Sequence, residues 1–135
     1  MSEIRQDPTT KEWVILATAR GKRPSDFAQH VPRPENPAFV ITCPFCPGNE
    51  AMTPPAVLSY RGDLNNGLWQ VRAFANGYPA VTPDGGSSIR TEQQLFQTVD
   101  GTGRHEVIVE TPVHNTQLAL MTDFEVSEVL RAYRE

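Results

Sequence analysis

Prolines are concentrated in one part of this sequence, and they restrict its fold more than any other feature. Residues 24–57 hold eight of the twelve prolines. Because proline lacks a backbone N–H and fixes φ, this stretch cannot form a regular helix or a central strand. A long structureless loop in a compact domain usually has a functional reason. We therefore expect a loop at about 24–57 that needs an additional source of order.

Two cysteines lie at the centre of this loop, in the segment Cys43-Pro-Phe-Cys46-Pro-Gly. Thiolates separated by two residues can bind one tetrahedral metal ion, and Pro47-Gly48 suits the tight turn that directs both sulfurs inward. One such pair is only half of a zinc site. The chain has no further cysteine, so the other ligands must be of another type.

The chain has three histidines, and they are the remaining candidate donors. His114 follows an expected strand in Thr111-Pro-Val-His114, and strand ends hold site residues on a rigid support. A lone histidine is more often an ordinary hydrogen-bonded surface residue, but the cysteine pair still lacks partners. We therefore expect His114 to be a metal ligand, His105 to be structural and His30 to be solvated.

Two other interpretations of the cysteines stay open. The segment Cys-Pro-Phe-Cys also looks like the redox motif of glutaredoxins, and a redox module predicts an accessible cysteine of low pKa. In glutaredoxins, however, the second cysteine begins a helix after a buried strand, whereas Pro47-Gly48 blocks a helix here. The cysteines could also be two ordinary buried residues.

Composition excludes several classes of protein. Two cysteines cannot build a disulfide scaffold, and no apolar run approaches the roughly 20 residues of a membrane span. The polar N-terminus lacks the apolar core of a signal peptide. The net charge of −4 disfavours indiscriminate binding to nucleic acid. We therefore expect a cytoplasmic protein that binds neither membranes nor nucleic acid.

Two short segments indicate ligand contacts. Ten of the 12 basic residues are arginines, and guanidinium groups bind phosphate bidentately. The segment Arg20-Gly-Lys-Arg23 is therefore a candidate anion site, although a solvated loop is as good an interpretation. Asn76-Gly77 is a strong turn pair because both residues tolerate positive φ. It could also let a ligand approach, with the Asn76 amide contacting a base or a ribose.

Aromatic and β-branched runs predict strands at 12–19, 68–75 and 106–110. Residues 82–103, rich in Gly, Ser, Thr and Gln, predict a loop with a short helical patch. Thr122 and Glu125 form a capping box at the start of a C-terminal helix, with Met121 and Val126 placed for a hydrophobic staple. The spacing puts four apolar residues on one helix face: Val126, Val129, Leu130 and Tyr133. No Gly or Pro stop signal follows the helix. This observation supports two interpretations equally: a sequence that is cut short, and a helix that ends at the C-terminus.

Four motifs occur in an order that resembles one known family. They are Glu12-Trp-Val-Ile leading into Arg20-Gly-Lys-Arg-Pro, then Cys43-Pro-Phe-Cys-Pro-Gly-Asn49, then Phe74-Ala-Asn-Gly-Tyr-Pro79, then Gly103-Arg-His-Glu-Val through His114. Each is weak alone, but the ordered set is similar to the N-terminal part of galactose-1-phosphate uridylyltransferase, a member of the histidine-triad superfamily. The resemblance implies an α+β fold with a histidine-triad-like antiparallel sheet and a packed helix, incomplete at the C-terminus. It covers residues 1–135 as a single, partial nucleotidyltransferase domain.

The resemblance also implies a chemistry and its residues. Such enzymes move a nucleoside monophosphate between sugar phosphates through a covalent nucleotidyl-histidine, and they act on nucleotide sugars and hexose 1-phosphates as homodimers. Zinc would bind Cys43, Cys46 and His114, and its fourth ligand would be a histidine just before the nucleophile, further along the sequence. Nucleotide-sugar contacts would fall on Arg20, Arg23, Asn76 and Gly77. Gly77 departs from the family, which often has Asp there.

The implied His-Pro-His-x-Gln segment would lie roughly thirty residues beyond Glu135. The chain alone would therefore lack both the nucleophile and the fourth zinc ligand, and would be inactive. Two alternatives remain open. One is a homologue that transfers adenylyl groups and acts on ADP-glucose. The stretch around Tyr78 and the Pro-Val-His ending also resemble such homologues. The other is a non-catalytic remnant that binds zinc and nucleotide.

Overall fold

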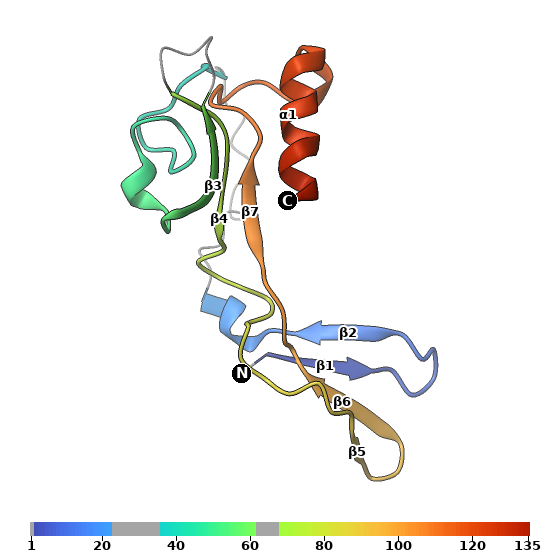
Figure 1. Cartoon of the computed structure of the whole chain (residues 1–135). Helices are drawn as coiled ribbons and strands as arrows, with labels where there is room; N and C mark the ends of the chain where they lie inside the picture. Colours follow the sequence, from blue (N-terminus) through green and yellow to red (C-terminus); the bar gives the residue numbers. More distant parts are fainter. Residues whose placement is uncertain (1, 23–35, 62–67) are drawn as a thin grey trace. The chain divides into compact units, whose positions relative to one another are not determined.

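The computed structural model describes residues 2–22, 36–61 and 68–135. The chain divides into two compact units, which are described separately (Figure 1). The first unit combines residues 1–29 with 78–105, and the second combines residues 30–77 with 106–135. Each contains one antiparallel sheet, and the second also contains the C-terminal helix. These elements confirm the α+β class.

The first unit contains a four-stranded sheet in the order β2-β1-β6-β5. Its strands are β1 (Glu3–Gln6), β2 (Trp13–Leu16), β5 (Arg90–Glu92) and β6 (Phe96–Asp100). All three pairings are antiparallel. A 3₁₀-helix, η1 (Thr18–Lys22), follows β2, so the strand expected over 12–19 ends three residues early, at Leu16.

The prediction of a loop with a helical patch at 82–103 was wrong, because this segment contains the β5–β6 hairpin. The turn uses Gln93 and Gln94, both at positive φ (50° and 59°). Glycine and asparagine are the usual residues of such turns. The sequence therefore carried no ordinary turn signal, and strands of three and five residues were too short for their alternation to be recognised.

The second unit contains a three-stranded sheet in the order β3-β4-β7. Its elements are η2 (Glu50–Met52), β3 (Ala56–Arg61), β4 (Trp69–Ala75), β7 (Glu106–Val109) and η4 (Leu118–Leu120). The strands expected at 68–75 and 106–110 are confirmed to within one residue at an end. Strand β3 begins directly after Pro54-Pro55 and lies at the sheet edge, where neighbouring prolines are tolerated.

Strand β4 is the centre of the second unit, and its residues Trp69–Phe74 are all buried. On one face Val71 packs with Tyr60, Val129 and Ala132 of the core. On the other face Phe74 lies against the cysteine loop, stacked on Phe45 with ring centroids 6.2 Å apart. Covering both faces explains why a strand containing Gln70 and Arg72 has no exposed polar face.

Helix α1 (Asp123–Arg134) begins as the sequence predicted. Thr122 accepts the Glu125 N–H, and the Glu125 carboxylate accepts the Thr122 N–H, which completes the capping box. The predicted face is partly wrong. Val129 and Ala132 are buried, whereas Leu130 and Tyr133 are more than half exposed. Because Ala132 is small, the helix can approach the sheet closely on the face that carries Ala132. A sequence pattern of apolar residues favours the larger Leu130 and Tyr133 as core residues, so it missed Ala132.

Within the parts of the chain that the structure describes, every helix is too short or too polar to traverse a lipid bilayer.

Candidate metal centre

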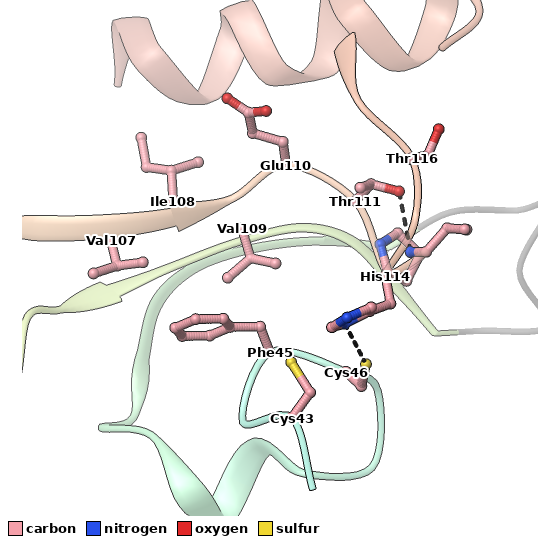
Figure 2. Close-up of a pocket in the computed structure, with 12 residues that line it drawn as sticks. Cys43, Phe45, Cys46, Val107, Ile108, Val109, Glu110, Thr111, His114 and Thr116 are labelled. Carbon is pink, nitrogen blue, oxygen red and sulfur yellow. Dashed lines mark hydrogen bonds between the residues drawn. The ribbon is translucent and has the colours of Figure 1, made fainter. Parts of the chain in front are cut away.

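The second unit brings Cys43, Cys46 and His114 together, as the sequence predicted. One donor atom from each residue lies within 4.8 Å of the other two. The Cys46 Sγ and His114 Nδ1 atoms are 3.5 Å apart. Figure 2 shows the His114 ring directed at the two sulfurs from the segment after β7. The group thus joins the proline-rich loop to a strand end 68 residues further along the chain.

The cysteine loop has a tight backbone that directs both sulfurs to one side. The Cys43 N–H donates to the Val40 carbonyl (3.0 Å), and the Cys46 N–H donates to the Cys43 carbonyl (3.2 Å). The Val40 N–H in turn donates to Cys46 Sγ at 3.4 Å. Gly48 takes φ 89°, a conformation that side-chain-bearing residues rarely adopt. The turn therefore favours glycine at position 48.

His114 is fixed to the same loop through its backbone. Its N–H donates to the Ala38 carbonyl at 2.9 Å. The neighbouring Asn115 side chain donates to the Asn36 carbonyl at 2.7 Å. Two successive residues after β7 are thus held by the segment that precedes Cys43, so the histidine approaches the sulfurs with little freedom.

The donor types are those that zinc prefers, and the Cys46–His114 distance suits a tetrahedral ion, while the whole group lies within 4.8 Å. Zn–S bonds of about 2.3 Å and Zn–N bonds of about 2.0 Å place neighbouring ligands roughly 3.5–3.8 Å apart, and the Cys46–His114 separation matches this range. Both cysteines are free. Burial raises the pKa of Cys46, and Cys43 nearby raises it further. Because a bound cation favours the thiolate, a metal ion would relieve that cost.

A pocket of about 320 Å³ lies between the cysteine loop and the end of β7. Side chains of β7 alternate across the sheet: Val107 and Val109 point to Phe45 and the loop, whereas Ile108 points to α1, as does Glu110 just after the strand (Figure 2). The loop face of β7 is thus apolar beside the three donors. Such walls exclude water from the space next to a bound ion and strengthen electrostatic interactions there.

Sequence reasoning missed the side chains that hold the loop together. Asn49 donates from Nδ2 to the carbonyls of Cys43 (2.8 Å) and Ile41 (2.9 Å), which closes the turn across the cysteine pair. Glu50 Oε1 accepts the Trp69 indole N–H at 2.7 Å and the Gly48 N–H at 3.1 Å. The available signal was Trp69 itself, because a buried tryptophan needs an acceptor for its indole N–H.

The pKa of the partly buried Glu50 carboxyl lies below its ordinary value. Desolvation by itself raises its pKa, but the bond from the Trp69 indole, the backbone bonds from Glu50 and Gly48, and the charge of Arg72 outweigh it. The net result is a pKa below the ordinary value of 4.5. The carboxylate is therefore stabilised in the charged form that accepts both hydrogen bonds.

Arg72 supports the same loop from β4, although only 4% of it is exposed. Its Nη2 atom donates to Thr53 Oγ1 and lies 3.4 Å from the carbonyls of Glu50 and Pro54. Its guanidinium lies 4.8 Å from the centroid of the Phe74 ring. These partners explain how an arginine can be buried in the middle of a strand.

The expected nucleotide-binding residues are distributed over both units. Arg20 lies in η1 of the first unit and donates to the Tyr78 carbonyl at 2.8 Å. Asn76 and Gly77 follow β4 in the second unit. Neither residue takes positive φ, so the expected positive-φ turn is replaced by a bend where the chain leaves that unit. Arg23 lies outside the described residues.

Of the other two histidines, only His105 lies within the described residues, and it is outside the donor group. His105 Nδ1 accepts the Ala80 N–H at 2.9 Å in the first unit, in keeping with the structural role expected for it. His30 lies outside the described residues.

The family can be assigned from the whole chain. The model of the family described as galactose-1-phosphate uridyl transferase, N-terminal domain, matches residues 1–135. This chain belongs to that family. The match covers both units and includes the three candidate metal ligands.

Curated relatives carry two kinds of name. An ADP-glucose phosphorylase of Arabidopsis thaliana is 36% identical over 98% of this chain and 37% of its own length. A galactose-1-phosphate uridylyltransferase of Haemophilus influenzae is 30% identical over 97% of this chain and 36% of its own length. The chain therefore spans about a third of the length of the relatives it matches.

Solved structures of proteins with the same two kinds of name also align with this chain. A crystal structure of the Arabidopsis thaliana ADP-glucose phosphorylase with bound ADP-glucose aligns with a TM-score of 0.52 and 31% identity, over 98% of this chain and 36% of that one. A uridylyltransferase structure aligns with a TM-score of 0.55 and 27% identity, over 96% of this chain and 32% of that one.

Proposed function

We propose that this chain is the zinc-binding N-terminal part of a nucleotidyltransferase that moves a uridylyl group from a nucleotide sugar to a hexose 1-phosphate. The observation that carries the proposal is the family match over residues 1–135 together with the convergence of Cys43, Cys46 and His114. Chains of this family need both a nucleotide site and a nucleophile. The described residues supply candidates for the first of these.

The proposed zinc ion is held by Cys43, Cys46 and His114, with a fourth ligand from sequence beyond this chain. When bound, the ion supplies a structural clamp, because the binding energy of a structural metal contributes directly to folding. Residues around it position the ligands. Asn49 closes the turn across the cysteine pair, and the Ala38 carbonyl binds the backbone N–H of His114.

The nucleotide sugar would be bound by Arg20, Arg23, Asn76 and Gly77. An arginine presents a planar set of donors that matches phosphate oxygens, and Arg20 already has one donor held by Tyr78, which limits its motion. Among the described residues, apart from its two chain neighbours, Gly77 has no atom within 4 Å of the position a Cβ would take. A substrate could therefore approach the backbone there without a steric barrier.

The proposed chemistry has two balanced steps. A histidine nitrogen from sequence outside residues 1–135 attacks the α-phosphorus, and the bond to the β-phosphate oxygen breaks to release a hexose 1-phosphate. A phosphate oxygen of a second hexose 1-phosphate then attacks the same phosphorus and frees the histidine. Our proposal includes a histidine-triad arrangement, a homodimer and a cytoplasmic location, with no binding to nucleic acid or membranes.

A second candidate function is transfer of an adenylyl group. The observation that favours it is the 36% identity to an ADP-glucose phosphorylase, against 30% to a uridylyltransferase. The two candidates share the metal site and the nucleotidyl-histidine chemistry, and they differ in the base and the sugar nucleotide. The metal site therefore does not distinguish them.

A labelling experiment tests both candidates. The full-length gene product is incubated with UDP-glucose or ADP-glucose, each labelled at the α-phosphate, and protein-bound label is measured after rapid gel filtration. We expect label from UDP-glucose that hexose 1-phosphate discharges. Label from ADP-glucose alone would establish the adenylyl candidate instead. Absence of label from both would contradict the proposed nucleotidyl transfer.

A further inference from the structure

Glu50 connects the cysteine loop to the sheet, although it lies outside the candidate ligand group. It follows Cys46 by four residues and begins η2. Its Oε1 accepts one N–H from the loop, at Gly48, and one from β4, at the Trp69 indole. A single carboxylate oxygen therefore bridges the turn that carries Cys46 and the central strand of the second unit.

The backbone of Glu50 is held on the same strand. Its carbonyl accepts the Thr53 N–H at 3.2 Å and the Thr53 hydroxyl at 2.9 Å. Arg72 of β4 lies 3.4 Å from that carbonyl through Nη2. Residue 50 is thus held through both its side chain and its main chain.

This connection matters because the metal donors come from two segments, which are joined near His114 by its bond to Ala38 and by the Asn115–Asn36 bond. Cys43 and Cys46 belong to the loop, whereas His114 follows β7, which pairs directly with β4. Their mutual distances depend on how the loop sits on the sheet. Within the described residues the donor group comprises Cys43, Cys46 and His114 but not Glu50, whose Oε1 is already engaged by two N–H donors.

We propose that Glu50 is a positioning residue for the metal site: it fixes the Cys46 end of the loop on β4 so that both sulfurs face His114 before metal binds. The inference rests on the proposed zinc site and adds a residue to it. Partners outside the ligand set of a metal site commonly change metal affinity by 10–100-fold.

Removal of this carboxylate has a clear structural consequence. Trp69 is only 7% exposed, so its indole N–H would lose its acceptor in a site that water reaches poorly. An unsatisfied buried donor is costly, and the chain would relieve that cost by moving Trp69 or the loop. Either movement changes the distance between the sulfurs and His114, which weakens metal binding.

The test compares Glu50→Ala with Glu50→Gln, with Glu106→Gln as a matched control on an exposed residue of β7 in the same unit. Zinc affinity is measured by competition with a chromophoric chelator, and the ligand set by the thiolate-to-cobalt absorption of the Co²⁺ form. We expect Glu50→Ala to bind zinc at least about tenfold more weakly. Glu50→Gln should stay within about threefold of wild type because its amide oxygen can accept both N–H groups.

Trp69→Phe provides a second variant that removes one donor and leaves Glu50 in place. Like Glu50→Ala, Trp69→Phe should weaken zinc binding. The cobalt–thiolate absorption band should be unchanged in every variant. An altered band in Glu50→Gln would make Glu50 a ligand and overturn the positioning role. Equal zinc affinity in wild type and Glu50→Ala would also overturn it. Absence of metal binding in wild type would instead refute the proposed zinc site, and the inference with it.

Discussion

Cys46 shows at the scale of a single residue how this site is built. It is 2% exposed, its sulfur accepts the Val40 N–H, and it lies 3.5 Å from His114 Nδ1. A buried thiol surrounded by these partners differs from the accessible, low-pKa cysteine that a redox module requires, because burial raises the pKa of Cys46. Cys46 is therefore unsuited to be the attacking thiol of a redox pair, and its contact with His114 is the observation that favours a metal ligand.

The first prediction concerns Cys43. Cys43→Ser should lower zinc affinity by more than about 100-fold, because a metal ligand is lost rather than one of its supports. Its thermal midpoint should fall further than that of His30→Ala, which removes a histidine that we expect to be solvated. Zinc content by mass spectrometry and calorimetry check this. Equal midpoints and equal zinc content in the two variants would refute the metal site.

The second prediction concerns pH and Glu50. Its folded-state pKa is lowered below the ordinary value of 4.5, so it contributes stability that is present above pH 4.5 and is lost as pH falls through the folded pKa. Wild type should therefore lose its stability advantage over Glu50→Gln as pH falls below 4.5. Urea denaturation of both proteins at several pH values measures this. A constant difference across the series would contradict the prediction.

At the scale of elements, helix α1 illustrates which features a sequence pattern can locate. The capping box specified its first residue because the Thr122 and Glu125 contacts lie within one turn. The buried side of the helix depends on how it meets β3, β4 and β7, which are distant in sequence. Val129 and Ala132 were selected by that packing, while Leu130 remained 59% exposed.

The third prediction uses two neighbouring residues of this helix. Val129 is fully buried, whereas Leu130 is largely exposed. Val129→Ala should lower the free energy of unfolding by about 2 kcal/mol, because it leaves a cavity in the core. Leu130→Ala should change it by less than about 0.5 kcal/mol. Denaturant titrations check both values, and the reverse order would show that the helix packs on the other face.

At the scale of the whole molecule, the nucleotide-binding residues that we propose belong to different units. Arg20 belongs to the first unit, and Asn76 and Gly77 belong to the second. The chain spans about a third of the length of its curated relatives. Activity is therefore best tested on the full-length protein, whereas metal binding concerns residues that all belong to the second unit.

The fourth prediction separates binding from folding in the arginine segment. Arg23→Ala should weaken nucleotide-sugar binding by about tenfold, the loss expected for one charge-assisted phosphate contact, with little change in melting temperature. Arg20→Ala should lower both, because Arg20 also holds the Tyr78 carbonyl. Calorimetric titration and thermal denaturation of the full-length protein measure these effects, with the exposed Arg104→Ala as control. A melting shift without an affinity shift in Arg23→Ala would make the segment structural.

The sequence by itself determined what is encoded over a few residues or in an order of motifs. It placed the strands around Trp69–Ala75 and Glu106–Val109, the start of α1, the irregular segment around the two cysteines and the candidate ligands Cys43, Cys46 and His114. These features depend on local backbone chemistry or on the family resemblance. Each could be recognised without knowing what lies opposite in the fold.

Tertiary structure alone decided which distant side chains support those features. The Trp69–Glu50 bond joins residues 19 apart, and the β5–β6 hairpin turns on two glutamines at positive φ. The choice of helix face and the burial of Arg72 likewise depend on neighbours brought by the sheet. Periodicity reports how apolar residues are spaced along one element, whereas hydrogen-bond satisfaction and packing are settled only when separate elements meet.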